Sequence, residues 1–224
     1  MNFNNLVSIG ATISTILLFS THMKTPIQIN RNINSIYNIS FLPHIMTFFS
    51  CSLWEKYGIL KGDLGIIFSN FIGIIITTHV IFVYYKNSRD LKPKVEKSFT
   101  IIILALISIL TYVKLNRGIT SYNVLGFICV ISSLLMLVSP LKILKEVVKT
   151  RENSHLSIQF ILISFISSSL WTLYGYFIND KFIIIPNGLG CLLAAIQALI
   201  YKIYSKEYNL PHNTIQMTPF HLKN

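Results

Sequence analysis

Long apolar segments and short polar ones alternate along the whole chain. Seven segments of 17 to 23 residues are dominated by Ile, Leu, Phe and Val. A helix needs about 20 apolar residues to cross the hydrocarbon core of a bilayer, so each segment is predicted to be a transmembrane helix. The predicted helices are Leu6–Met23, Phe41–Leu60, Leu64–Tyr85, Phe99–Leu115, Tyr122–Leu141, Ile158–Phe177 and Phe182–Tyr204. The first has no basic start and no small-residue cleavage site, so we expect a retained helix rather than a signal peptide.

Part of this pattern occurs twice. The stretch Leu53–Gly73, "LWEKYGILKGDLGIIFSNFIG", nearly recurs as Leu170–Gly190, "LWTLYGYFINDKFIIIPNGLG". At an offset of 117 residues, 9 of the 21 positions are identical. The first three helices therefore correspond to the last three, and Phe99–Leu115 remains as an unpaired connector.

This arrangement predicts the fold. One helix between two triplets gives both triplets the same orientation, and such parallel repeats are known in transporters, with the substrate site between the halves. We predict an all-α membrane protein whose seven transmembrane helices form two parallel three-helix repeats joined by a connector helix (3+1+3). Residues 1–90 form the first repeat, 91–120 the connector, 121–205 the second repeat and 206–224 a cytoplasmic tail.

Composition agrees with a membrane protein and charge suggests its orientation. Hydrophobic residues make up 52% of the chain and charged residues 12%, about half of the usual 25%. The net charge of +11 is unevenly placed, because fourteen Lys and Arg fall in one set of connections and four in the other. By the positive-inside rule the N-terminus is extracytoplasmic and the C-terminus cytoplasmic. The charge thus indicates topology rather than a nucleic-acid partner.

No metal or cofactor chemistry is evident. Cys51, Cys129 and Cys191 lie singly in apolar helices, and the six His form no HExxH motif. We therefore expect no metal and no cofactor. We also expect no enzymatic activity, because no nucleophile, base and orienting group recur near the duplicated polar residues described next.

The duplicated polar residues indicate a binding site. Asn70 and Asn187 fall inside the third helix of each repeat, where an amide is costly unless it has a partner or faces a wet cavity. A single membrane Asn often packs helices together, and a single Trp is often interfacial. Their shared register with Trp54 and Trp171 instead favours one cavity between the repeats. Amides and indole faces suit an uncharged polyol.

At these residues the chain resembles the SWEET family of sugar transporters. The matching motifs are "LWEKYG", "SNFIG", "SPLKILKEVVKT", "SLWTLYG" and "PNGLGCLLAAIQALIY", within Gly10–Tyr204. The resemblance implies uniport of mono- or disaccharides by alternating access, without ATP or ion coupling, and self-association into a homo-oligomer. It implies sugar binding by Asn70, Asn187 and Trp171, with Trp54 at the partner position and Ser50 and Ser167 as weaker candidates. It also implies gating by Tyr57, Tyr174, Asp180, Pro43, Pro140 and Gln197.

The chain departs from the family at its cytoplasmic-side prolines. Pro43 and Pro140 match, but Met23 and Ser157 stand where the family often has proline. Pro26 is three residues late, and we expect it only to begin a loop. Animal members commonly depart here, so we interpret the chain as an animal-type member.

Two other functions stay open. One is amino-acid export of the lysosomal Pro-Gln-loop type, although the chain has no Pro-Gln pair. The other is a membrane adaptor whose repeats merely pack together. For the favoured function, Trp at both positions 54 and 171 narrows the site and favours monosaccharides. The expected location is the plasma membrane or the Golgi, with the lipid bilayer and a small sugar as partners and no nucleic acid.

Overall fold

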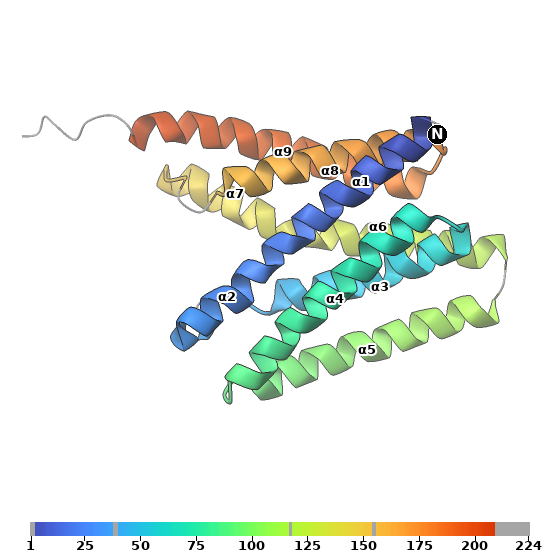
Figure 1. Ribbon diagram of the computed structural model, residues 1–224, viewed down its shortest axis with the longest axis horizontal. Coiled ribbons are helices and arrows are strands. Elements are labelled where there is room, and N and C mark those ends of the chain that lie inside the picture. The colour runs from blue at the N-terminus through green and yellow to red at the C-terminus, as the bar shows by residue number, and fades with distance from the viewer. Residues whose placement is uncertain (1–2, 38–39, 117, 154–155, 209–224) are drawn as a thin grey trace, which may run out of the picture.

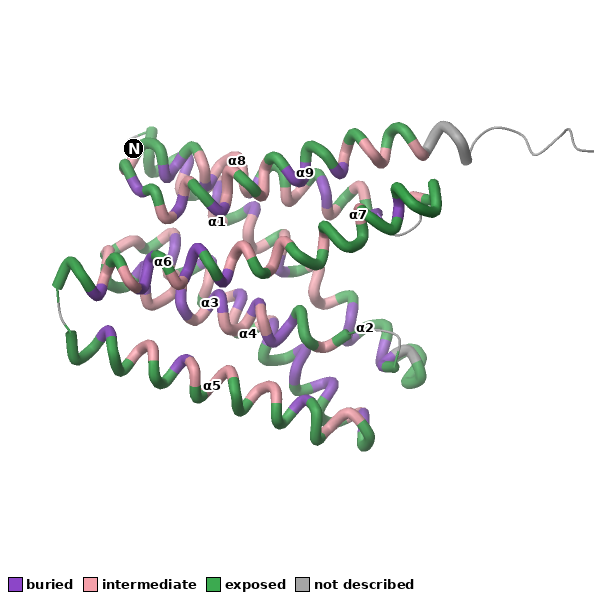
Figure 2. The backbone as a smooth tube through the Cα atoms, turned by 180° about the vertical axis from the view of Figure 1, so that it is seen from behind, coloured by how far each residue is buried: buried purple, intermediate pink, exposed green. Residues whose placement is uncertain are grey.

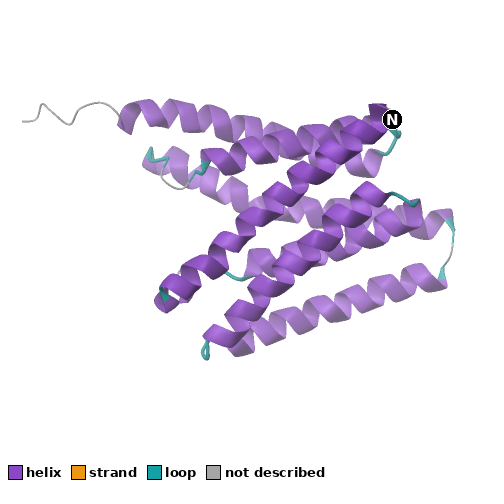
Figure 3. Cartoon of the chain, in the orientation of Figure 1, coloured by secondary structure: helices purple, strands orange, loops and turns teal. Residues whose placement is uncertain are grey.

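The computed structural model describes residues 3–37, 40–116, 118–153 and 156–208, which form helices and no strand (Figures 1 and 3). The helices are α1 (Phe3–Ser20), α2 (Lys24–Arg31), α3 (Leu42–Lys61), α4 (Leu64–Asn87), α5 (Lys92–Leu115), α6 (Ile119–Met136), α7 (Val138–Thr150), α8 (Ile158–Phe177) and α9 (Lys181–Tyr208). Two short 3-10 helices are η1 (Thr21–Met23) and η2 (Ile33–Tyr37). Beyond the end of α9, the predicted tail lies outside the described residues.

Six stretches of the described chain are long and apolar enough to cross a membrane. They are Phe3–Arg31, Leu64–Asn87, Lys92–Leu115, Ile119–Thr150, Ile158–Phe177 and Lys181–Tyr204. The first and fourth exceed their predicted lengths by the most, because α1 continues through η1 into α2 and only Leu137 separates α6 from α7. The predicted helix Phe41–Leu60 is present as α3 but is not among these six.

The surroundings of α3 explain its lower apolarity. It carries Glu55 and Lys56, and it packs against α4, α5 and α6. Ile45, Leu53 and Tyr57 of α3 are fully buried. A helix enclosed by other helices meets little lipid, so it tolerates more polar residues than a helix on the outside.

The packing of the helices repeats itself (Figure 1). In the first half α4 contacts α1 and α3, and in the second half α9 contacts α6 and α8. Across the halves α1 contacts α8, and α3 contacts α6. Helix α5, the predicted connector, packs against α3, α4 and α6. At the offset of 117 residues, α1 corresponds to α6 and α3 to α8, so the two cross contacts are equivalent.

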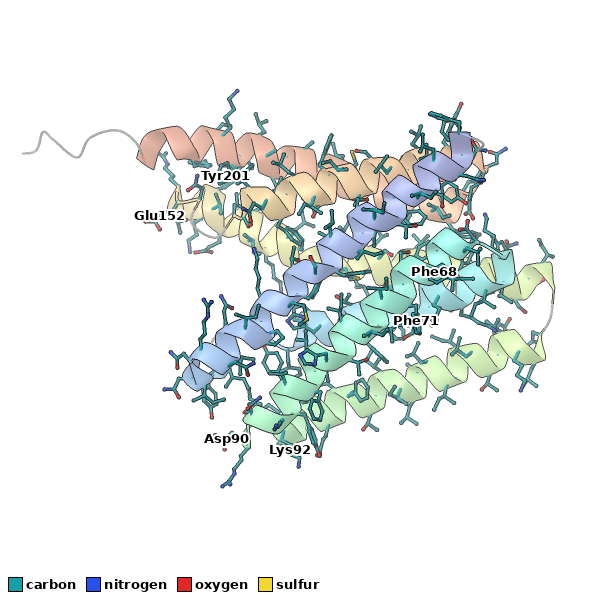
Figure 4. All side chains as sticks on the ribbon, in the orientation of Figure 1. Phe68, Phe71, Asp90, Lys92, Glu152 and Tyr201 are labelled. Carbon is teal, nitrogen blue, oxygen red and sulfur yellow. The ribbon has the colours of Figure 1, made fainter. Side chains whose placement is uncertain are left out.

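Large apolar side chains cover the outside of the bundle. Phe68 and Phe71 of α4, labelled in Figure 4, are 56% and 49% exposed. Exposed positions recur along the outer faces of most helices in Figure 2. So much exposed apolar surface is unfavourable in water and is what a lipid-facing surface requires.

The turns α3–α4 and α8–α9 share one construction, which explains the duplicated Asp. Asp63 caps α4 by accepting a hydrogen bond from the Ile66 N–H at 3.2 Å, and Asp180 caps α9 by accepting from the Phe182 N–H at 3.0 Å. The residue before each Asp has a left-handed backbone, with φ of 71° at Gly62 and 58° at Asn179.

Close helix contact explains the duplicated Gly. A Cβ on Gly58 would lie 2.9 Å from Cγ2 of Ile66. A Cβ on Gly175 would lie 3.0 Å from Cγ2 of Ile183 and from Cγ1 of Ile184. These two Gly residues therefore let the second and third helices of each half approach closely beside the turn.

At the other end, the first helix of each half is interrupted near a proline. The η1 turn begins five residues before Pro26, and α6 ends at Met136, four residues before Pro140. Proline cannot donate to the carbonyl four residues earlier and clashes with it, which interrupts the helix. Pro26 is the third residue of α2, so the expectation that it only begins a loop is wrong.

The other three positions at which the family has cytoplasmic-side prolines lie at helix ends. Pro43 is the second residue of α3, where a missing N–H costs little. Ser157 is the N-cap of α8, and its hydroxyl accepts a hydrogen bond from the Phe160 N–H at 3.4 Å. Met23 is the last residue of η1. Pro43 and Ser157 therefore start helices rather than bend them.

Candidate substrate-binding cavity

A cavity of about 220 Å³ lies among α1, α3, α4, α6, α8 and α9. Its wall contains all six residues predicted to bind substrate: Ser50, Trp54, Asn70, Ser167, Trp171 and Asn187. The other lining residues are Thr15, Leu18, Phe19, Cys51, Ile66, Ser69, Ser133, Met136, Leu137, Ser168, Ile183, Pro186 and Gly190. None of the lining residues has a charged side chain.

The two asparagines present the same atom to the cavity. Nδ2 of Asn70 donates to the Ile66 carbonyl at 2.8 Å, and Nδ2 of Asn187 donates to the Ile183 carbonyl at 2.8 Å. A carbonyl can only accept, so each amide nitrogen must face its own helix. Each Oδ1 is thereby left without a donor among the described residues, and it can accept a hydrogen bond from a ligand.

The two tryptophans use their N–H groups within the protein. Nε1 of Trp54 donates to the Ser133 hydroxyl at 2.9 Å, and Nε1 of Trp171 donates to the Thr15 hydroxyl at 2.7 Å. Each bond crosses between the halves, from α3 to α6 and from α8 to α1. The indoles are therefore fixed in place, and what remains for a ligand is the face of each ring.

Two serines of the cavity also pair with hydroxyl groups of the opposite half. Ser167 pairs with Thr15 at 2.9 Å between hydroxyl oxygens, and Ser50 pairs with Ser132 at 3.1 Å. The sequence analysis missed Thr15, Ser132 and Ser133. One signal was available, because Thr15 and Ser132 are related by the offset of 117 residues.

Two crossed hydrogen bonds join the halves at the end of the molecule that holds the α3–α4 and α8–α9 turns. The Tyr57 hydroxyl donates to Oδ2 of Asp180 at 2.6 Å, and the Tyr174 hydroxyl donates to Oδ2 of Asp63 at 2.6 Å. Tyr57 is fully buried and Asp180 is 5% exposed. Both carboxylates thus use Oδ1 to cap a helix and Oδ2 to hold the opposite half.

This closure is asymmetric. Lys61 forms an ion pair with Asp180, and the Tyr122 hydroxyl lies 2.5 Å from that of Tyr57. The position related to Lys61 in the second half is Ile178, so Asp63 has no equivalent cation. Sequence reasoning missed Lys61 and Tyr122, because neither residue is repeated.

None of the six predicted gating residues lines the cavity, and three of them take no part in the Tyr–Asp closure either. Gln197 is buried in α9, ten residues beyond Asn187, and does not line the cavity. Pro43 and Pro140 also lie outside its wall, although Met136 and Leu137, at the break before Pro140, line it. The structure therefore brings the six predicted binding residues together but leaves these three apart.

Comparison with known proteins identifies the family. The sugar transporter SWEET1 of Drosophila pseudoobscura pseudoobscura is 32% identical over 207 residues, covering 89% of this chain and 88% of the relative. SWEET1 of Danio rerio is 30% identical over 203 residues, covering 90% and 92%. A profile described as "Sugar efflux transporter for intercellular exchange" matches residues 5–90 and 123–209. The chain belongs to the SWEET family.

The predicted family is therefore confirmed. A solved eukaryotic SWEET transporter has the same fold, with a TM-score of 0.83 at 20% identity, covering 92% of this chain and 100% of that chain. As a SWEET protein the chain is a multi-pass membrane protein and a sugar transporter rather than an enzyme. The two profile matches flank the predicted connector Phe99–Leu115.

Proposed function

We propose that the chain is a facilitative uniporter of sugars, and of monosaccharides such as glucose in particular. One observation carries the proposal: an uncharged cavity presents two asparagine oxygens and two indole faces from opposite halves. Sugar hydroxyls donate to Oδ1 of Asn70 and Asn187, while the C–H face of the ring lies on Trp54 or Trp171. A volume of about 220 Å³ is below the roughly 300–1,000 Å³ of sites for drug-sized ligands, which favours one sugar ring over two.

The proposal includes the 3+1+3 arrangement. The duplicated turns, the two equivalent cross contacts and the two profile matches support two parallel triplets, with α5 as the connector. Related halves place the binding residues at equivalent depths. A substrate between them then meets similar groups from either side, as alternating access requires.

Alternating access needs a closure at each end in turn. In the proposed cycle the pairs Tyr57–Asp180 and Tyr174–Asp63 close one end, and they break together when that end opens. The interruptions near Pro26 and Pro140 supply the movement at the other end. We assign Pro43 and Gln197 to the same movement on the strength of the family resemblance.

The lack of charged side chains in the cavity wall supports uniport. Proton-coupled carriers usually use an intramembrane carboxylate, and none lines this cavity. The same observation disfavours amino-acid export, because a zwitterion needs charged or strongly polar partners for both of its ends. A membrane adaptor has no need of two unpaired amide oxygens in a cavity.

We also propose the orientation given by the charges, with the Tyr–Asp pairs extracytoplasmic and the end of α9 cytoplasmic. In Figure 1 the N-terminus and the end of α9 lie at opposite ends of the molecule, which agrees with this orientation. The proposed membrane is the plasma membrane or the Golgi.

Radiolabelled uptake in transport-deficient cells tests the substrate. We expect saturable uptake of glucose, less uptake of sucrose and none of a neutral amino acid. Uptake of the amino acid without uptake of either sugar, at confirmed surface expression, would refute the proposal.

A further inference from the structure

Helix α7 carries a stripe of three lysines. Lys142, Lys145 and Lys149 are spaced i, i+3 and i+7, which places them on one helical face. All three are exposed, whereas Val147, on the opposite face, is fully buried. The stripe therefore points away from the protein.

Against the three lysines of this stripe, α7 carries one acidic residue, Glu146. Within the described ranges, none of the stripe's ammonium groups is in an ion pair. Helix α7 packs against α6 and α9, and its buried Val147 lies in one cluster with Ile161 of α8; Figure 2 shows the rest of the helix as mostly exposed. Leu141 and Val148, beside the stripe, are 51% and 47% exposed. Exposed apolar and cationic side chains on one helix suit the boundary between acyl chains and headgroups.

The length of the span places α7 at that boundary. The stretch Ile119–Thr150 has 32 residues, or about 48 Å at 1.5 Å per residue, against about 30 Å of hydrocarbon. The excess of about 18 Å is close to the length of α7. The lysine stripe therefore lies near the depth of the headgroups.

The fold itself does not require the lysines. At the offset of 117 residues, the equivalents of the three lysines in the first half are Thr25, Gln28 and Asn32. That half follows its first helix with α2 just as the second half follows α6 with α7. The lysine stripe is therefore present on α7 in the second half and has no counterpart at the equivalent positions of the first half.

We propose that the lysine stripe binds the headgroups of anionic phospholipids in the adjoining leaflet. Three exposed, unpaired cations match an anionic surface, and the flanking apolar side chains match the acyl chains beneath it. The proposed function is needed only to identify this leaflet as the cytoplasmic one. By holding α7 beyond the interruption near Pro140, such lipids act at the end where we place the inner movement.

Native mass spectrometry of the purified full-length protein tests this inference. The protein is titrated in detergent with phosphatidylserine or with phosphatidylcholine. We expect Lys142→Gln, Lys145→Gln and Lys149→Gln together to weaken phosphatidylserine binding by about a hundredfold, the equivalent of about 3 kcal/mol, and to leave phosphatidylcholine binding unchanged. Replacing the same three lysines by Arg should retain the binding.

The matched control removes the same charge from the same end of the molecule. Lys86, Lys94 and Lys97, exposed near the α4–α5 turn, are replaced by Gln. Binding should persist in this control; an equal loss in both triple variants, or unchanged binding in the stripe variant, would overturn the proposal. If the stripe variant does not fold, Lys145→Gln alone decides, with an expected loss of about fivefold. The lipid titration involves no sugar, so a negative result would refute the lipid-binding proposal without bearing on the proposed sugar transport.

Discussion

Replacing Asn187 with Ala should strongly weaken sugar binding and leave the fold intact. The Nδ2 of this side chain donates its hydrogen bond to the Ile183 carbonyl of its own helix, so the side chain contributes little to holding the two halves together. What the cavity loses is Oδ1, the acceptor that we propose for a sugar hydroxyl. A buried hydroxyl without a partner costs about 1–3 kcal/mol, which weakens binding by about 5- to 150-fold. The cost to stability should stay near the average of about 0.6 kcal/mol for hydrogen bonds in membrane proteins.

Asn116 offers a matched control. Its Nδ2 donates to the Tyr112 carbonyl at 3.0 Å, the same bond four residues back, but the residue is exposed at the end of α5. Asn116→Ala therefore removes an equivalent local bond far from the cavity. Glucose uptake per surface-localised molecule and the melting temperature in detergent are measured for both variants and for Asn70→Ala. We expect loss of uptake in the two cavity variants alone.

Packing predicts the reverse result. If Asn70 and Asn187 only hold helices together, their Ala variants should melt earlier while each surviving molecule transports normally. Normal uptake per molecule in both variants would refute the assignment of the binding site.

Three further substitutions separate the roles of single atoms. Asp180→Asn keeps the oxygen that caps α9 but places an amide nitrogen against the donors Tyr57 and Lys61, so we expect the closed end to open more often. The assay uses a background without Cys129 and Cys191, in which an impermeant thiol reagent applied at that end should label Cys51 of the cavity at least about tenfold faster. An unchanged labelling rate would count against the gate. Thr15→Val removes the acceptor of the Trp171 N–H, and we expect about a tenfold rise in KM for glucose, whereas Thr172→Val, outside the cavity, should leave KM unchanged. Gly175→Ala places a Cβ 3.0 Å from Ile183 and Ile184; we expect a loss of about 1–3 kcal/mol, seen as a lower melting temperature, and unaltered stability would contradict the close packing.

Much of the site was predictable because it is duplicated. The offset of 117 residues put Asn70 with Asn187 and Trp54 with Trp171, and the structure places all four in one cavity. Apolar segment length likewise predicted the helices, since the bilayer fixes how long a span must be.

Features that depend on tertiary contacts were not predictable in this way. Nothing local to Thr15 or Ser133 indicates that each accepts an indole N–H from the opposite half. Lys61 has no counterpart at the offset of 117 residues, so the sequence repeat could not indicate its ion pair with Asp180. Pro26 was misjudged because its effect reaches four residues back, to η1, and position alone suggested a loop.

Sugar equilibration in proteoliposomes tests the central claim most directly. The purified chain is reconstituted and given radiolabelled glucose, with or without an imposed pH gradient and membrane potential. A uniporter with an uncharged cavity should bring internal glucose up to the external concentration and no further, at a rate unaffected by either gradient, and unlabelled internal glucose should drive exchange of the label. Accumulation above the external concentration under a gradient, or no glucose entry beyond that of empty vesicles, would contradict the account.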